Sequence, residues 1–556
     1  MIQFKTIDGL LLRDMVMAGT ALLEKNREAV DALNVFPVPD GDTGTNMSLT
    51  MQSAAREINS KEFLRADEAA SALAKGALKG ARGNSGVITS QLLRGFAKSL
   101  SGVEKITPVQ FAEALGKGAE MAYKAVMKPK EGTILTVARV VAEDALKQAQ
   151  KDPEDYDKLF SVILKSGEAI LKKTPDMLPV LKQAGVVDSG GRGLLLIYQG
   201  YAAVLRGEDI NLTETGMESD YADQADDCHD LTKELTHAYC VNFSLINFRE
   251  DCDEHDLDSF RRRLNRIGDN VTVSGDLKQA TVHVHTDSPG SVLEYGIELA
   301  EIIEIKIDNL ADMKRKLEAE NGPAPAAEEK QPDPAEPEKK YGFVAVSLGA
   351  GFSQFFQDLN VDQIVEGGQT MNPSVDDLMC AVNQVPAQCV FILPNNGNVI
   401  FAANQAAELC KKDVRVIPTK NVAMGIAAAI AFQNDLDPEE NVSRMDEAAQ
   451  HVKTGMVTYA IRDSEYNGIA IRQGDIIGLH NGKIEFSGTS IREVVMEMMK
   501  NIITDEDELV TVYYGADVKE EDAKEIADAI EAEYDACDVE CHNGGQPLYY
   551  YLISVE

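Results

Sequence analysis

Residues 35–48 read VFPVPDGDTGTNMS, and the organisation of the chain is best understood from this stretch. Pro37 and Pro39 hold its first half extended and remove backbone donors, so we do not expect a helix there. Asp40 and Asp42 flank a glycine, and two carboxylates this close repel each other unless a hard cation lies between them. Mg²⁺ prefers one or two carboxylates together with phosphate oxygens, which this spacing could supply. Taken alone, Asp-Gly-Asp is also a common turn.

The residues after this acidic pair are typical of a helix that begins beside phosphate. Thr43, Gly44, Thr45 and Asn46 stand where the first backbone N–H groups of a helix lack partners within it. Apolar residues then recur at helical spacing as far as residue 205, with few runs typical of strands. An all-helical domain of antiparallel amphipathic helices, arranged as a barrel or bundle, is therefore expected over residues 1–207.

Glycine and proline interrupt this helical pattern, and three interruptions carry polar groups. KGALKGARGNSGV (75–87) places Ser85 and Gly86 in a turn ahead of an apolar run. KPKEGTIL (128–135) places Thr133 at an expected helix start, where its hydroxyl could simply cap the helix. AGVVDSGGRG (184–193) surrounds two charged residues with glycines. Each segment considered alone is compatible with an ordinary interhelical loop.

The stretch LNVFPVPDGDTGTNM resembles the nucleotide-site signature of the dihydroxyacetone-kinase ATP-binding domain. It is most similar to the form found in the catalytic subunit of bacterial fatty acid kinase, and the three interruptions match that domain in order and spacing. The resemblance implies that Asp40 and Asp42 hold Mg²⁺ against the ATP phosphates. Dihydroxyacetone kinases have a further Asp shortly before the pair, and here Asn34 is the nearest polar candidate for a third ligand.

The same resemblance assigns the remaining residues of the predicted site. Thr43, Gly44, Thr45 and Asn46 follow the acidic pair as part of the nucleotide site. Ser85 and Gly86 would contact the phosphates, and Thr133 would lie near the nucleotide. The segment from Asp188 to Gly193 would form a loop that closes over it, with Arg192 and the two carboxylates of the acidic pair as the catalytic residues. No nucleophile of the enzyme is needed, because phosphoryl transfer depends mainly on positioning and charge neutralisation.

Length and composition limit the possible classes of protein. A chain of 556 residues suggests about three or four domains. Its formal net charge of −37 argues against binding to nucleic acid or anionic membranes. We expect no transmembrane segment, because no apolar run is long enough to span a bilayer. Eight scattered cysteines and the lack of a secretory signal favour a cytoplasmic protein.

After residue 207 the pattern changes. Residues 208–230 are acidic and polar and are expected to form a linker. HAYCVNFSLINF (237–248) and ATVHVHTDSP (280–289) alternate apolar and polar residues as strands do, and DEHDLDSFRRRLNRIG (253–268) has a helical pattern. A small α+β domain is therefore predicted over residues 231–317.

This middle domain contains a candidate zinc site. His283 and His285 are two residues apart on one strand and so project from the same face, and Cys240 is on a candidate neighbouring strand. Two imidazoles and a thiolate suit Zn²⁺, with His237, Asp287, water or a partner's atom as the fourth ligand, although ordinary surface histidines would give the same pattern. YCVNF and HVHTDSPG also resemble the middle domain of the fatty acid kinase family, which implies zinc at Cys240, His283 and His285.

The C-terminal part begins after a second linker. Residues 318–340 are rich in Pro, Ala and Glu and are expected to be disordered. Residues 341–556 alternate short apolar strands with helical segments, which predicts an α/β domain of two lobes. Three segments, GAGFSQFF (349–356), EGGQTMNPS (366–374) and PNNGN (394–398), are expected to be loops at strand ends. They resemble the family's C-terminal domain, which docks the lipid-loaded binding protein.

The resemblance covers essentially the full length and implies a multidomain fatty acid kinase. Such an enzyme would use ATP and Mg²⁺ to phosphorylate the carboxylate of a fatty acid held by a separate binding protein. The product would be an acyl phosphate for phospholipid synthesis, and the enzyme would be a homodimer. Two alternatives stay open. One is a kinase for dihydroxyacetone (glycerone), although no stretch resembles its substrate domain. The other is a zinc-stabilised adaptor that binds nucleotide without transferring phosphate.

Overall fold

The computed structural model describes most of the chain. The described residues are 4–34, 41–126, 128–208, 237, 239–249, 252, 254–275, 279–309, 339–368, 372–460, 464–466 and 469–556. The predicted linkers fall almost wholly outside these ranges. The chain divides into two compact units, of which one contains residues 1–218 and 336–556 and the other residues 219–335. No helix in the described part of the chain is both long enough and apolar enough to cross a membrane.

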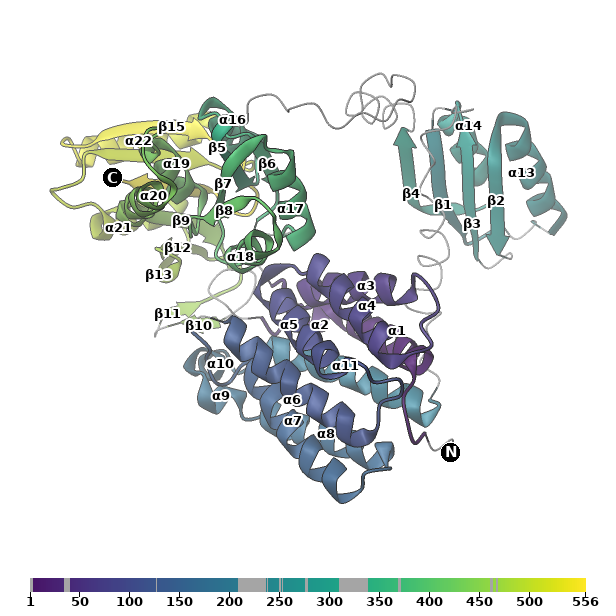
Figure 1. The fold of residues 1–556 in the computed structure, drawn as a ribbon. Coiled ribbons are helices and arrows are strands. Elements are labelled where there is room, and N and C mark those ends of the chain that lie inside the picture. The colour runs from purple at the N-terminus through teal and green to yellow at the C-terminus, as the bar shows by residue number, and fades with distance from the viewer. Residues whose placement is uncertain are drawn as a thin grey trace, which may run out of the picture. The chain divides into compact units, whose positions relative to one another are not determined.

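The first part of the chain is helical throughout its described residues, as predicted (Figure 1). Its helices are α1 (Gly9–Lys25), α2 (Arg27–Asp31), α3 (Thr43–Asn59), α4 (Ala66–Lys79), α5 (Gly83–Ser99), α6 (Pro108–Ala125), α7 (Ile134–Lys151), α8 (Tyr156–Leu171), α9 (Thr174–Met177), α10 (Pro179–Ala184) and α11 (Ser189–Arg206). Side-chain caps define several of their starts. Asp8 caps α1, and α6 begins with a capping box formed by Thr107 and Gln110.

The long helices pack against their sequence neighbours, and the last returns to the first. Contacts run from α3 through α4, α5, α6 and α7 to α8, then to α11, and α11 contacts α1, which itself contacts α3. Two glycines allow α1 and α11 to approach closely, because a Cβ added at Gly200 would lie 2.4 Å from the Cα of Gly19. This packing places the starts of α3, α5, α7 and α11 where they line one cavity.

The second unit is an α+β domain, as predicted. Its elements are β1 (Tyr239–Ile246), α13 (Glu254–Ile267), β2 (Gly268–Gly275), β3 (Gln279–Thr286), α14 (Pro289–Ile297) and β4 (Glu301–Asn309). The strands form an antiparallel sheet in the order β2-β3-β1-β4. Alternate residues of β1 and β3, including Val241, Phe243, Val282 and Val284, form its core, which explains the alternating sequence pattern.

Among its described residues, the C-terminal part contains two large sheets, in agreement with the predicted two lobes, and a separate two-stranded pair. The strands of the first lobe, β5 (Lys339–Ser347), β6 (Gln363–Glu366), β7 (Ala387–Leu393) and β8 (Asp413–Val416), are all parallel, in the order β6-β5-β7-β8. The helices of this part are α16 (Ala350–Asp358), α17 (Val375–Gln384), α18 (Ile400–Leu409), α19 (Val422–Ala431), α20 (Pro438–His451), α21 (Ile491–Ile502) and α22 (Glu520–Glu533).

The second lobe is a mixed six-stranded sheet in the order β13-β12-β9-β16-β14-β15. Its strands are β9 (Lys453–Tyr459), β12 (Ile476–His480), β13 (Lys483–Gly488), β14 (Leu509–Tyr514), β15 (Asp538–Asn543) and β16 (Tyr551–Val555), and β10 (Ser464–Tyr466) pairs separately with β11 (Ile469–Ile471).

The structure corrects two sequence-based expectations for the C-terminal part. The glycine-rich pattern predicts a loop at residues 349–356, but most of this segment belongs to helix α16. Phe352 and Phe356 are one helical turn apart and both are buried, so their packing overrides the glycine-rich start. In addition, the second predicted linker extends to residue 340, whereas β5 already begins at Lys339.

Candidate active site

A cavity of about 640 Å³ is lined by both the helical domain and the C-terminal part of the first unit. Six residues predicted for the nucleotide site line it, namely Asn34, Asp42, Thr43, Ser85, Thr133 and Asp188. The C-terminal part contributes Lys420 and a set of side-chain amides to the lining, which are Asn395, Asn396, Asn398, Asn421 and Gln546. The fold therefore brings together residues that are far apart in the sequence.

Asp42 is a buried carboxylate in the lining of the cavity. It stands immediately before α3, and it is only 8% exposed. Its Oδ2 accepts a hydrogen bond of 2.7 Å from Nδ2 of Asn372. Burial raises the pKa of Asp42 to about 6, and hydrogen bonds from Asn46 and Asn372 oppose that rise. Its predicted companion, Asp40, lies outside the described residues.

A carboxylate that the sequence pattern does not single out supports the start of α3. Asp31 accepts hydrogen bonds from the backbone N–H of Thr45 at 3.1 Å and from its hydroxyl at 2.8 Å. Its negative charge also contributes to the raised pKa of Asp42. The resemblance implies an acidic residue before the pair, which is a signal that could have identified Asp31 beside Asn34. Asp31 lies in a stretch whose pattern predicts a helix, and that pattern gives no sign that the residue belongs to the site.

The start of α3 is fixed by close packing. A Cβ at Gly44 would lie 2.3 Å from the backbone oxygen of Arg27, so the glycine lets α3 approach the beginning of α2. Thr43 Oγ1 accepts a hydrogen bond of 3.2 Å from Ser189 Oγ at the start of α11. These contacts give Gly44 and Thr45 packing and anchoring functions, whereas Thr43 lines the cavity.

The glycine-rich segment near residue 83 differs from the expected turn, because α5 begins at Gly83. Ser85 therefore lies in the first helical turn, where N–H groups lack partners within the helix and can bind anions. Gly83 has a φ of +55°, and a Cβ there would lie 2.5 Å from Nδ2 of Asn46. Gly86 faces α3, since its Cβ would lie 2.3 Å from Oγ1 of Thr50. Ser85 lines the cavity, and Gly86 allows the helices to pack.

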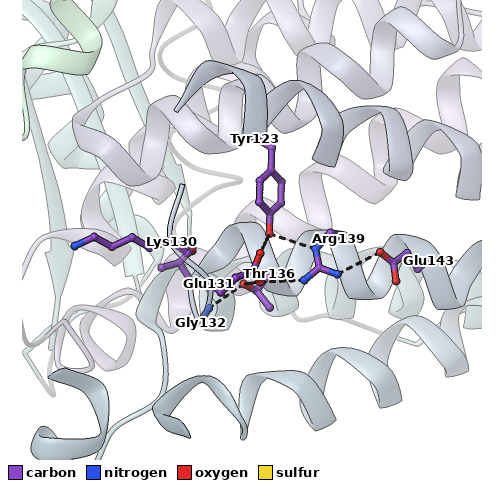
Figure 2. A network of polar contacts seen from close by, with 8 residues as sticks. Tyr123, Lys130, Glu131, Gly132, Thr136, Arg139 and Glu143 are labelled. Carbon is purple, nitrogen blue, oxygen red and sulfur yellow. Dashed lines mark hydrogen bonds and ion pairs between the residues drawn. The ribbon is translucent and has the colours of Figure 1, made fainter. Parts of the chain in front are cut away.

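The turn that precedes α7 is held by a network of polar contacts (Figure 2). The carboxylate of Glu131 accepts hydrogen bonds from Tyr123 Oη at 2.9 Å, Thr136 Oγ1 at 2.7 Å and Arg139 at 2.9 Å. These contacts lower the pKa of Glu131, with the bond from Thr136 contributing most. Thr133 occupies the N-cap position of α7, but its hydroxyl donates to the backbone oxygen of Lys130 at 2.8 Å instead of capping the helix.

Asp188 caps α11 at the edge of the same cavity, and because of this cap residues 189–193 form the start of the helix and not the expected loop. One carboxylate oxygen accepts a hydrogen bond of 2.7 Å from the N–H of Gly191, and its own N–H donates to Thr174 Oγ1. Burial raises the pKa of Asp188 to about 6. Asp42 and Asp188 thus bind protons more tightly in the folded chain than in the unfolded chain. Their contribution to stability is complete below pH 3.8 and is lost as the pH rises through about 6.

Arg192 follows Asp188 on α11 but is engaged elsewhere. Its guanidinium forms an ion pair of 2.9 Å with Glu168 on α8, and it is not among the described residues that line the cavity. Its catalytic assignment stays a prediction. Among the described residues, the charged side chains that do line the cavity are Asp42, Asp188 and Lys420.

In the second unit, the strand register relates the predicted zinc ligands. Cys240 on β1 is directly opposite His285 on β3, and His285 is opposite Asp269 on β2. His237 Nδ1 lies 2.9 Å from a carboxylate oxygen of Asp287. The side chain of His283 lies outside the described part of the chain. Among the side chains that the structure describes, no three His, Cys, Asp or Glu residues form a metal-binding cluster.

Solved structures give only weak likenesses. One is a DegV family protein from Corynebacterium glutamicum, 14% identical, with a TM-score of 0.30 over 39% of this chain and 97% of the other. Another is the dihydroxyacetone kinase from C. freundii in complex with AMP-PNP and Mg²⁺, 21% identical, with a TM-score of 0.28 over 36% and 35%. At TM-scores this low, the likenesses carry no functional argument.

Family models and full-length relatives are more informative. A DAK2 domain matches residues 37–203, and two fatty acid kinase models, the FakA-like middle domain and the FakA-like C-terminal domain, match residues 236–317 and 342–556. The Bacillus subtilis protein YloV is 42% identical over 99% of this chain and 100% of its own length. An uncharacterized protein of Staphylococcus saprophyticus is 40% identical over 99% of both. The chain therefore belongs to the FakA-like fatty acid kinase family and carries an N-terminal DAK2 domain.

Proposed function

We propose that this protein is an ATP-dependent kinase that phosphorylates the carboxylate of a fatty acid presented by a separate binding protein. The observation that carries the proposal is the cavity in which Asp42, Thr43, Ser85, Thr133 and Asp188 meet. These residues come from the DAK2 domain, and the two domains that follow it match the fatty acid kinase models. The family assignment supports a kinase, and the cavity would supply a site for its nucleotide.

The cavity residues fit MgATP in their chemistry. Asp42, with Asp40 beside it in sequence, would hold Mg²⁺, which neutralises phosphate charge when bound. The first turns of α3 and α5 would offer N–H groups to phosphate oxygens, apart from that of Thr45, which donates to Asp31. Thr133 and Asp188 are fixed at neighbouring helix starts and would define the walls around the nucleotide. This arrangement would position the reactants. It provides no nucleophile of its own, and phosphoryl transfer needs none from the protein, because the acceptor attacks the phosphoryl group directly.

The acceptor in this proposal is a fatty acid carboxylate, and the product is an acyl phosphate for phospholipid synthesis. A long acyl chain has to be shielded from water, and a separate fatty-acid-binding protein would supply that apolar environment. The C-terminal part, which matches the FakA-like C-terminal model over residues 342–556, would dock this partner. The homodimer and the cytoplasmic location stay predictions.

We further propose that the middle domain binds Zn²⁺ through Cys240, His283 and His285. The strand register supports this because it places Cys240 opposite His285, and a thiolate with imidazoles is a donor set that suits zinc.

The zinc proposal predicts the metal content of a variant. Cys240→Ala should lower zinc from about one equivalent per chain to a small fraction of that, because a ligand is lost from a site of about four. Metal analysis of the purified full chain measures this directly. Cys380→Ala, which removes an exposed cysteine, is the matched control and should retain zinc. Unchanged zinc in the Cys240→Ala protein would contradict the assignment.

Two other functions lead to different results in the same kinase assay. A glycerone kinase should phosphorylate dihydroxyacetone without any protein partner, whereas an adaptor should bind MgATP and phosphorylate nothing. Assays with oleate plus a fatty-acid-binding protein, with oleate alone and with dihydroxyacetone therefore separate the three functions. Transfer to dihydroxyacetone alone would overturn the proposed acceptor.

A further inference from the structure

Asn372 belongs to the C-terminal part of the chain but contacts the carboxylate of Asp42, which lines the cavity. Its Nδ2 donates to Oδ2 of Asp42 at 2.7 Å, across 330 residues of sequence. The same nitrogen lies 3.4 Å from Oδ1 of Asn46 on α3. Asn372 is only 1% exposed, and its Oδ1 is buried without a hydrogen-bond partner among the described residues. The buried amide of Asn372 is therefore fixed in hydrogen-bond contact with the carboxylate of Asp42.

Backbone contacts fix the position of Asn372 against the start of α5. Arg82 Nη1 donates to the backbone oxygen of Asn372 at 2.9 Å, and Arg82 also lies 3.4 Å from Asp377. The N–H of Val375 donates to the backbone oxygen of Ala81 at 3.1 Å. The side chains of Ala81 and Val87 pack into the core of the parallel-sheet lobe. The loop that carries Asn372 is therefore attached to the helical domain both at this residue and just after it.

Asp42 needs such a donor because its surroundings disfavour a negative charge. The carboxylate is buried, and the charge of Asp31 acts against its ionised form. No Lys or Arg of the helical domain is among the described residues that line the cavity. An N–H group that donates to one carboxylate oxygen stabilises the charge and fixes the plane of the carboxylate. Asn46 also donates to this carboxylate, so the two amides together fix its orientation.

We propose that Asn372 is a positioning residue for phosphoryl transfer, which orients Asp42 for binding of a divalent cation. This inference rests on the proposed function, in which Asp42 holds Mg²⁺. Under this proposal, the C-terminal part contributes a residue to the nucleotide site, in addition to docking the fatty-acid-binding partner.

The test measures how much Mg²⁺ the full chain needs to bind and turn over ATP. ATP is held constant, and calorimetry and a turnover assay follow the response to free Mg²⁺. Asn372→Ala should raise the half-saturating Mg²⁺ concentration by about tenfold, because a hydrogen bond to a charged group is lost. Asn372→Leu, which lacks the donor but fills the space, should produce the same rise.

Gln405→Ala is the matched control. Gln405 also joins the two parts of this unit through a buried amide contact, since Gln91 donates to it at 2.7 Å, but it does not line the cavity. It should leave the Mg²⁺ requirement unchanged while it lowers the thermal unfolding temperature to an extent comparable with Asn372→Ala. A rise in the Mg²⁺ requirement with Gln405→Ala as well would assign the effect to general loosening and overturn the inference.

The remaining outcomes separate this inference from the proposed function. An unchanged or lower Mg²⁺ requirement in both Asn372 variants, with the unsubstituted protein binding MgATP normally, would overturn the positioning role alone. A rise in Asn372→Ala without a rise in Asn372→Leu would assign the effect to packing and would also overturn it. Failure of the unsubstituted protein to bind MgATP would instead overturn the proposed function.

Discussion

Asp42→Ala is expected to reduce phosphoryl transfer by roughly a hundredfold or more, because the variant loses the carboxylate that would hold Mg²⁺ against the phosphates. The metal-free protein should remain folded. Burial raises the pKa of Asp42 from 3.8 to about 6, so at neutral pH the ionised side chain costs folding free energy. Removing it also leaves the buried amide of Asn372 without its acceptor, so the gain and the loss should largely cancel and the thermal unfolding temperature should change little. Turnover and thermal unfolding without Mg²⁺ measure the two effects.

A surface carboxylate provides the control for Asp42. Asp144→Ala removes an acidic side chain that pairs with Lys147 on the outside of α7, and it should preserve full transfer activity. If Asp42→Ala retained the biological function of the protein while ATP was still bound, the adaptor hypothesis would replace the kinase.

Replacing Asp188 should separate the effect of its hydrogen bonds from that of its charge. Asp188→Ala is expected to cost about 1 kcal/mol of stability, because an N-cap is lost, and to lower transfer by about tenfold as the start of α11 loosens beside the cavity. Asn caps helices as well as Asp does and carries no buried charge, so Asp188→Asn should have equal or higher stability at neutral pH and keep most of the activity. Denaturant unfolding and steady-state kinetics measure both variants.

The asparagine variant decides between two roles for Asp188. An Asp188→Asn protein as inactive as Asp188→Ala, yet stable, would show that the negative charge takes part in the reaction. Retained activity would show that Asp188 acts only as the cap of α11. It would hold the first turn, in which Ser189 donates a hydrogen bond to Thr43.

Much of the site can be predicted from sequence because its helix starts are encoded locally. Proline, glycine and acidic residues mark the breaks between helices, and four such breaks, matched to one family in order and spacing, identify residues that line the cavity. The local sequence pattern also gives a wrong prediction in the C-terminal part. The sequence predicts a loop where α16 forms, because burial of Phe352 and Phe356 outweighs the glycines at its start.

Contacts between distant segments cannot be predicted in this way. Nothing in the sequence around Asn372 indicates that its amide reaches Asp42, because that contact depends on how a strand-end loop packs on α5. Asp31, in contrast, is close to the signature in sequence. The pattern does not single it out, because it is the last residue of a short helix and resembles an ordinary surface residue. Sequence identifies the groups that are local to the phosphate segment, and the fold is needed to find those that support them.

The most direct test of the central claim is acyl phosphate formation by the purified full-length protein. The protein is incubated with MgATP and oleate, with and without a cognate fatty-acid-binding protein, and acyl phosphate is trapped with hydroxylamine as the hydroxamate. The proposed function predicts hydroxamate only when the binding protein is present. Absence of hydroxamate from every mixture, in a protein that binds MgATP, would contradict it.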